Sequence, residues 1–219
     1  MEKILSNARS RGLLSTHSVL RKTYFMLALT LAFSALTAGV STYLHLPAPG
    51  LILMLVGFYG LMFLTYRLSS GIGGIFAAFA FTGFLGYCLG PVLNMYLSAG
   101  MGQTIALALG GTAVTFFGCS AYVLTTKRDM SFLGGMMMAG FVVLLVAMLA
   151  NLFLHLPALQ MTISALFILF SSAAILWETS NIIQGGETNY IRATVSLYVS
   201  IYNIFVSLLS LLGFASRND

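Results

Sequence analysis

Residues 130–177 read MSFLGGMMMAGFVVLLVAMLANLFLHLPALQMTISALFILFSSAAILW, and none of these 48 positions is Asp, Glu, Lys or Arg. A second run without these four residue types covers 68–126. A soluble domain of 219 residues needs a charged surface, yet only fifteen side chains in this chain are charged. Apolar runs of this length are stable with lipid as their solvent. The chain is therefore predicted to be an integral membrane protein.

The apolar runs are predicted to be helices. A bilayer core of about 30 Å is crossed by about 20 helical residues, and backbone groups in lipid must pair within their own segment. Strands of a membrane barrel would alternate polar and apolar residues, and the sequence lacks that pattern. Cutting the chain at Pro, Gly and polar clusters gives seven runs, roughly 24–46, 50–66, 72–97, 104–124, 132–154, 159–183 and 191–214. The predicted fold class is all-α integral membrane with seven transmembrane helices.

The basic residues predict the orientation. The tail at 1–22 carries five of them, and the loops after the second, fourth and sixth helices carry four more. The opposite side has Arg217 alone. Lys and Arg are enriched on the cytoplasmic side, so the amino terminus is predicted to be cytoplasmic and the carboxyl terminus periplasmic. The expected domains are this tail, a seven-helix transmembrane domain at 23–214 and a short carboxyl tail at 215–219.

Small residues mark two faces where helices are expected to pack closely. The first set is spaced three, four and four residues apart and comprises Gly83, Gly86, Gly90 and Asn94. Pro91 beside it is expected to kink that helix. The second set comprises Gly111, Thr115 and Gly118. Small residues allow close backbone approach in lipid, so both faces are interpreted as packing seams, with a ligand path along the glycines as the alternative.

Polar residues on the last helix form a stripe. They recur every three or four residues and comprise Arg192, Ser196, Ser200, Asn203, Ser207 and Ser210. A helix that faces lipid has no use for such a stripe. We therefore expect the helix at 191–214 to lie at the centre of the other six. Packing alone explains the stripe, and an ion or proton path is the alternative.

Glu178 is the only carboxylate within a predicted span. It shares a helix face with Ser164 and Ser171, which precede it by fourteen and seven residues. A charge deep in a bilayer costs about 2.5–3.5 kcal/mol and usually marks function. Glu178 is therefore a candidate functional acid, with Arg67 and Arg192 as candidate partners. The alternative is a helix that ends earlier and leaves Glu178 among the lipid headgroups.

A five-residue sequence, LHLPA, occurs at 44–48 and again at 154–158. Both copies fall at predicted turns on the same side of the membrane. Shared turn chemistry, in which proline stops each helix, is one interpretation, and a parallel internal repeat is the other. Sensing of external pH by His45 and His155 is a further hypothesis.

Motifs of hydrolases, phosphate-binding loops and paired cysteines are absent from the sequence. The chain is therefore predicted to be a non-enzyme that holds no metal and no cofactor. Its net charge of +5 reflects topology and contact with the lipid bilayer, so no nucleic acid partner is expected.

Three segments resemble the Bax inhibitor-1 family. The loop KRDMSFL at 127–133 is similar to that family's Lys/Arg-x-Asp-Leu/Met-Ser-Phe-Leu segment. The segment WETSNII at 177–183 resembles its aromatic-Asp-Thr-Gln-x-Ile, and SLYVSIYNIF at 196–205 resembles its Ser-Leu-Tyr-Leu-Asp-Phe-Ile-Asn-Leu-Phe. The resemblance covers nearly the whole chain and implies a seventh helix wrapped by the other six.

In members of the family that leak calcium, the resemblance implies a pH-sensitive gate. It consists of two carboxylates, from the sixth and seventh helices, and an arginine near the end of the second. The first carboxylate corresponds to Glu178 and the arginine to Arg67. The second corresponds to Ser200, which is not an acid, so the chain lacks the second carboxylate of that gate. Asn203 and Arg192 complete the candidate gate residues, and the ligand would be calcium or protons.

The segment GGETNYIR at 185–192 resembles a bacterial inner-membrane subgroup of the family that modulates the membrane protease FtsH. The resemblance implies an FtsH complex as the partner and protein quality control as the function. A protease that pulls on cytoplasmic ends needs a flexible handle, for which the candidates are Lys3, Arg9 and Arg11 in the tail. A tail that only sets the topology is the alternative, and a cation or proton leak is the alternative function.

Overall fold

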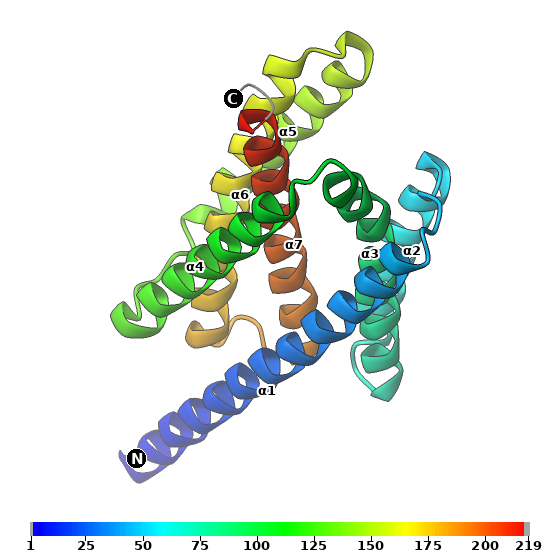
Figure 1. The fold of residues 1–219 in the computed structure, drawn as a ribbon. Helices are drawn as coiled ribbons and strands as arrows, with labels where there is room; N and C mark the ends of the chain where they lie inside the picture. Colours follow the sequence, from blue (N-terminus) through cyan, green and yellow to red (C-terminus); the bar gives the residue numbers. More distant parts are fainter. Residues whose placement is uncertain (1, 217–219) are drawn as a thin grey trace. The chain divides into compact units, whose positions relative to one another are not determined.

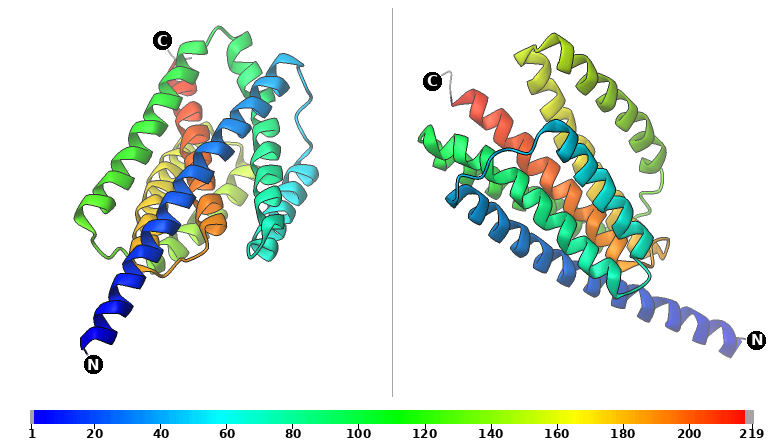
Figure 2. Two further views of the ribbon diagram at one scale, coloured as in Figure 1. Left: turned by 90° about the horizontal axis from the view of Figure 1, so that it is seen from below. Right: turned by 90° about the vertical axis from the view of Figure 1, so that its right-hand side faces the viewer.

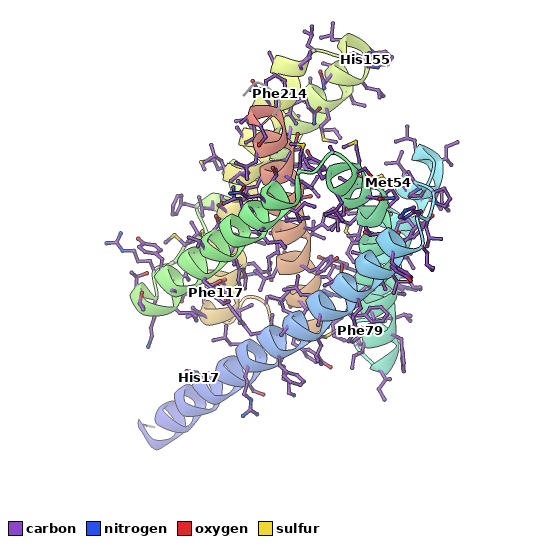
Figure 3. The ribbon with its side chains drawn as sticks, viewed as in Figure 1. His17, Met54, Phe79, Phe117, His155 and Phe214 are labelled. Carbon is purple, nitrogen blue, oxygen red and sulfur yellow. The ribbon has the colours of Figure 1, made fainter. Side chains whose placement is uncertain are left out.

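The computed structural model describes the backbone of residues 2–216 and the side chains of residues 17–216, of which His17 is labelled in Figure 3. Its elements are seven α-helices, α1 (Glu2–Tyr43), α2 (Leu51–Leu68), α3 (Ile72–Ser98), α4 (Gly102–Thr126), α5 (Leu133–Leu154), α6 (Pro157–Gln184) and α7 (Tyr190–Ala215) (Figure 1). All seven are long and apolar enough to cross a membrane, and no strand occurs between residues 2 and 216. The prediction of an all-α fold with seven such helices is confirmed.

The first helix is longer than expected at its amino end. We expected a flexible tail at 1–22, but the described backbone is one continuous helix from Glu2 to Tyr43, as Figure 2 shows. The tail has no proline and only one glycine, Gly12, so nothing in it stops a helix. The expectation of flexibility is wrong for this backbone. The segment that would cross the membrane is His17–Tyr43.

The chain divides into two compact units. The first comprises Met1–Met95 and Asn181–Tyr198, and the second comprises Tyr96–Ser180 and Val199–Asp219. The first unit therefore holds α1, α2, most of α3, the end of α6 and the beginning of α7. The second unit holds α4, α5, most of α6 and the rest of α7.

In the first unit, the glycine face of α3 packs against α1. A Cβ atom added to Gly86 would meet the carbonyl group of Ser34, and one added to Gly90 would meet Ser41. Gly83 lies close to the ring of Phe33, which also makes an edge-on contact with Phe79 of α3 (labelled in Figure 3) at 5.5 Å between ring centroids. The expected seam is confirmed, and α1 fills the face along which a ligand path was the alternative.

Proline in α3 creates one of the bonds that join these two helices. Pro91 has no N–H, so the carbonyl group of Tyr87, four residues earlier, loses its helical donor. The hydroxyl group of Ser41 on α1 donates to that carbonyl at 3.0 Å. One residue on, the hydroxyl group of Thr42 donates to the Gly90 carbonyl at 3.2 Å. The helix continues past Pro91 to Ser98, and the expected kink stays a prediction.

In the second unit, the expected seam on α4 is only partly present. Gly111 lies against Leu208 of α7, 3.0 Å from a Cβ position, whereas nothing lies within 4 Å of a Cβ on Gly118. The hydroxyl group of Thr115 donates within its own helix, to the carbonyl of Gly111 at 2.8 Å. The prediction is therefore wrong for Gly118. Spacing alone cannot tell a glycine that faces a neighbouring helix from one that faces lipid.

The two LHLPA copies share a backbone conformation. His45 follows α1 with φ of 52°, and His155 follows α5 with φ of 50°. In each turn the histidine Nδ1 lies near a backbone carbonyl oxygen, of Thr42 at 2.8 Å and of Phe153 at 3.1 Å respectively (His155 is labelled in Figure 3). This left-handed residue after a helix is a common way to end it. The copies thus have similar turn chemistry, and the repeat stays a prediction.

Candidate functional site

Glu178 lies within α6, and its side chain is buried. Its side chain is 4% exposed, and the helix continues for six more residues to Gln184, or about 9 Å of helix. The alternative, in which the helix ends early and leaves Glu178 solvated, is wrong. Because charge is costly at a buried position in a membrane protein, the surroundings of this carboxyl group must either compensate the charge or favour the protonated form.

Several hydroxyl groups in the second unit are buried without a hydrogen-bond partner among the described residues. One is Ser171 on the expected face of Glu178, 1% exposed; the others are those of Thr179, next to Glu178, and of Ser120 on α4. Ser164, at the far end of that face, instead donates to the Gln160 carbonyl at 3.0 Å. Unsatisfied buried hydroxyls are uncommon and indicate a polar interior. Neither Thr179 nor Ser120 lies on a polar stripe, so the spacing of polar residues does not indicate them.

The α7 stripe contributes to the same unit. Ser200 and Ser207 are buried, and Asn203 is half-buried. Burial is not restricted to this face, however, since Leu197 and Ile204 are fully buried too. The prediction that Ser200 is shielded from lipid is confirmed. Of the other stripe residues, Ser196 and Ser210 are half-buried and Arg192 is exposed. The stripe is therefore less buried than the apolar faces of α7.

In the first unit, Arg192 is held at the amino-terminal end of α7. Its Nε donates to the hydroxyl group of Ser69 at 3.0 Å, and its guanidinium carbon lies 5.8 Å from the ring centre of Tyr66. Asn189 donates to the Ser69 carbonyl at 2.9 Å and caps α7 by accepting from the N–H of Ile191 at 2.9 Å. This junction fastens the α2–α3 turn to the start of α7.

The candidate gate residues are distributed over both units. Glu178, Ser200 and Asn203 belong to the second, whereas Arg67 and Arg192 belong to the first. Arg67 is exposed in the last turn of α2, next to Tyr66. The pairing of Glu178 with either arginine stays a prediction. The handle candidates are Lys3, Arg9 and Arg11, and their side chains lie outside the described part of the chain.

Tyr198 joins three helices of the first unit, although it is not part of the polar stripe of α7. Its hydroxyl group lies 2.5 Å from that of Ser34 on α1 and donates to the Thr82 carbonyl on α3 at 3.2 Å. The side chain is 1% exposed. A buried tyrosine hydroxyl usually finds a partner, so a tyrosine in the middle of an apolar helix was the available signal.

Ser180 holds the loop between α4 and α5. Its hydroxyl group accepts from the N–H of Met130 at 2.9 Å and donates to the carbonyl of Arg128 at 3.1 Å. Within the loop, the Asp129 carboxylate accepts from the N–H of Ser131 at 2.8 Å. Two of the segments that resemble the family are therefore in direct contact. Among the side chains of residues 17–216, no three of His, Cys, Asp or Glu come together as metal ligands would.

Similarity to known proteins extends along the whole chain. Residues 16–218 match the family described as Inhibitor of apoptosis-promoting Bax1. The chain is 73% identical over 219 residues, all of both chains, to the Escherichia coli K12 protein named Modulator of FtsH protease YccA. The same identity and coverage hold for the Inner membrane protein YccA of Escherichia coli O6:H1. An uncharacterized protein of Pasteurella multocida is 62% identical over 200 residues, 91% of each chain.

Proposed function

Because the chain belongs to the Bax inhibitor-1 family, we propose that it binds the membrane AAA protease FtsH and limits degradation of other membrane proteins. The observation that carries this proposal is the 73% identity to a protein named for modulating that protease, over the full length of both chains. The proposal gives the chain no catalytic step of its own. Its site of action is the bacterial inner membrane, as the name of a second relative indicates for that relative.

The proposed topology places the amino terminus in the cytoplasm, where the protease would engage it. Nine of the ten Lys and Arg residues fall on that side of the seven helices, which supports this orientation. The carboxyl terminus would then be periplasmic. The proposed place of α7 at the centre of the other helices is supported by buried residues over most of its circumference, which include Val195, Leu197, Ser200, Ile201 and Ile204.

In the proposed mechanism, the chain occupies the protease as a slow client. Pulling on the amino terminus would first unwind the part of α1 before His17, and then load the membrane-spanning part. That part is tied to α3 through Ser41 and Thr42, and to α7 through Ser34. Thr194 of α7 also donates to the backbone carbonyl of Thr23, at 3.2 Å. Because these bonds must break before α1 leaves the membrane, extraction is slow.

Deletion of residues 2–10 tests the proposal. The shortened chain keeps the membrane-spanning part of α1 and the bonds listed above, but loses most of the segment that the protease would grip. We expect it to lose FtsH-dependent turnover and to change the turnover of other FtsH membrane substrates. A deletion of residues 217–219 is the matched control and leaves both unchanged. Unaltered turnover of substrates together with unaltered association with FtsH would refute the proposed role.

A second candidate function is a cation or proton leak, and the burial of Glu178 favours it. The hydroxyl groups of Thr179, the next residue, and of Ser171, seven residues earlier, are buried without a hydrogen-bond partner among the described residues. Such groups are the usual components of an ion or proton path. Ser200, at the position of the family's second acid, offers a hydroxyl group in place of a carboxylate. Any such path would therefore bind a cation more weakly than a pair of carboxylates does.

Measurement of ion flux in liposomes tests whether the protein has this second candidate function. Wild-type protein and Glu178→Gln, in which the ionisable carboxyl group is removed, are compared between about pH 6 and pH 8, on either side of physiological pH. The leak predicts flux in the wild type and a loss of its pH dependence in the variant. Equal flux in the two proteins, or none in either, would exclude a leak through Glu178 and would leave the FtsH proposal intact.

A further inference from the structure

At one end of the first unit, cations and tyrosines alternate along a line of contacts. The Nζ of Lys22 on α1 lies 5.8 Å from the ring centre of Tyr190, the first residue of α7. Two residues on, Arg192 lies over Tyr66 of α2 at 5.8 Å. Arg67 follows Tyr66 in the last turn of α2. These five residues, Lys22, Tyr66, Arg67, Tyr190 and Arg192, are called the interfacial cluster below.

The cluster has more positive charge than the first unit can neutralise. The acidic residues of this unit are Glu2, whose side chain is outside the described part, and Glu187. One carboxylate oxygen of Glu187 accepts from the backbone N–H of Asn189 at 2.7 Å. Lys22, Arg67 and Arg192 are exposed, and none forms an ion pair with a described carboxylate. Their natural complement is an external anion.

Arg192 is pre-organised for such an anion. Its Nε is engaged by the hydroxyl group of Ser69, a residue only 4% exposed, so one edge of the guanidinium group is fixed. The two terminal NH₂ groups have no hydrogen-bond partner among the described residues. A guanidinium held in this way presents two parallel N–H groups, the arrangement that matches the oxygens of a phosphate group.

The position of the cluster selects the kind of phosphate. It lies where α2 ends and α7 begins, at the ends of helices that are long and apolar enough to span a membrane. Tyrosine side chains favour this level of a bilayer, where the ring is apolar and the hydroxyl group is wet. We propose that the interfacial cluster binds the headgroup phosphate of an anionic phospholipid, with Arg192 as the main ligand and Lys22 and Arg67 as supporting charges.

General attraction between basic loops and anionic lipid does not require this arrangement. Arg128, in the loop between α4 and α5, has an equally exposed cation, but only its backbone carbonyl is held, by Ser180. It therefore serves as a control for charge without pre-organisation. Ser69→Ala is the complementary variant, because it keeps every charge and removes the hydroxyl group that orients Arg192.

The test is native mass spectrometry of the full-length protein after incubation with equal amounts of phosphatidylglycerol and phosphatidylcholine. The wild type is expected to retain phosphatidylglycerol in preference. Arg192→Gln should lower this preference about tenfold, since a charge-assisted hydrogen bond is lost, and Ser69→Ala should lower it about threefold. Arg128→Gln should keep the preference. Arg192→Lys keeps the charge without the planar fork and should also weaken the preference. This variant tests the orientation of the cation if Ser69→Ala fails to fold.

Three results would overturn the proposal. The first is a wild-type protein that retains the two lipids equally. The second is the same loss of preference in Arg128→Gln as in Arg192→Gln, which would indicate general electrostatics. The third is displacement of the retained lipid by excess inorganic phosphate, which would identify the ligand as a free anion and not a lipid headgroup.

Discussion

The hydroxyl groups of Ser34 and Tyr198 lie 2.5 Å apart, although 164 positions separate the two residues in the sequence. Ser34 belongs to the membrane-spanning part of α1 and Tyr198 to α7, and Tyr198 also donates to the carbonyl group of Thr82 on α3. In lipid, apolar surface gives little preference for one helix partner over another, so polar contacts of this kind specify which helices associate. This pair fixes α1 in the first unit.

Replacing Tyr198 by Phe removes only the hydroxyl group. We expect the free energy of unfolding in mild detergent to fall by about 0.6–2 kcal/mol, because interhelical hydrogen bonds in membrane proteins contribute roughly this much. Tyr122→Phe on α4 is the matched control, since that side chain is 43% exposed, and it should leave stability unchanged. Equal stability of the wild type and Tyr198→Phe would show that the Ser34–Tyr198 contact contributes nothing.

Two glycines on different helices should respond to alanine with opposite sign. In Gly86→Ala the new methyl group would meet the Ser34 carbonyl, and the resulting strain is expected to lower stability by about 1–3 kcal/mol. In Gly118→Ala the methyl group meets nothing within 4 Å, so the better helix propensity of alanine should raise stability by up to about 1 kcal/mol. Unfolding by a denaturing detergent measures both. A stable Gly86→Ala protein would contradict the close packing of α1 on α3.

Ser180→Ala should loosen the loop between α4 and α5. The substitution leaves the N–H of Met130 and the carbonyl of Arg128 without the hydroxyl group that joins them. Amide hydrogen exchange at residues 128–131 is expected to speed up about tenfold, as the loss of a buried hydrogen bond of about 1.4 kcal/mol implies. In the control, Ser172→Ala, the lost bond runs within α6, to the carbonyl of Ile168. If both variants exchanged alike in this loop, Ser180 would not be its clamp.

The number of helices and the bounds of the last six could be predicted because Pro, Gly and polar clusters separate the apolar runs. The last six helices begin and end within two residues of the expected positions. The burial of Glu178 was one of two alternatives, because the uncharged run ends at Trp177 and polar residues follow it. The helical structure of the tail could not be predicted, because its polar composition is compatible with either a helix or a flexible segment.

Contacts between helices depend on which face of each helix meets its neighbour, and the sequence does not contain this information. Gly86 and Gly118 occur in similar small-residue spacings, yet only Gly86 lies against another helix backbone. Tyr198 and Ser69 were not identified either, because the partner of each lies more than 100 residues away. Such polar pairs become visible only when the helices are placed side by side.

The central claim, that the bonds holding α1 make this chain a slow FtsH client, is tested most directly by a degradation rate. The double variant Ser34→Ala, Tyr198→Phe keeps residues 2–22 intact and is compared with the wild type in proteoliposomes that contain FtsH. Forced extraction follows the unfolding rate, so a loss of about 0.6–1.4 kcal/mol predicts degradation roughly three- to tenfold faster, with association unchanged. Degradation of the double variant at the wild-type rate would contradict the claim.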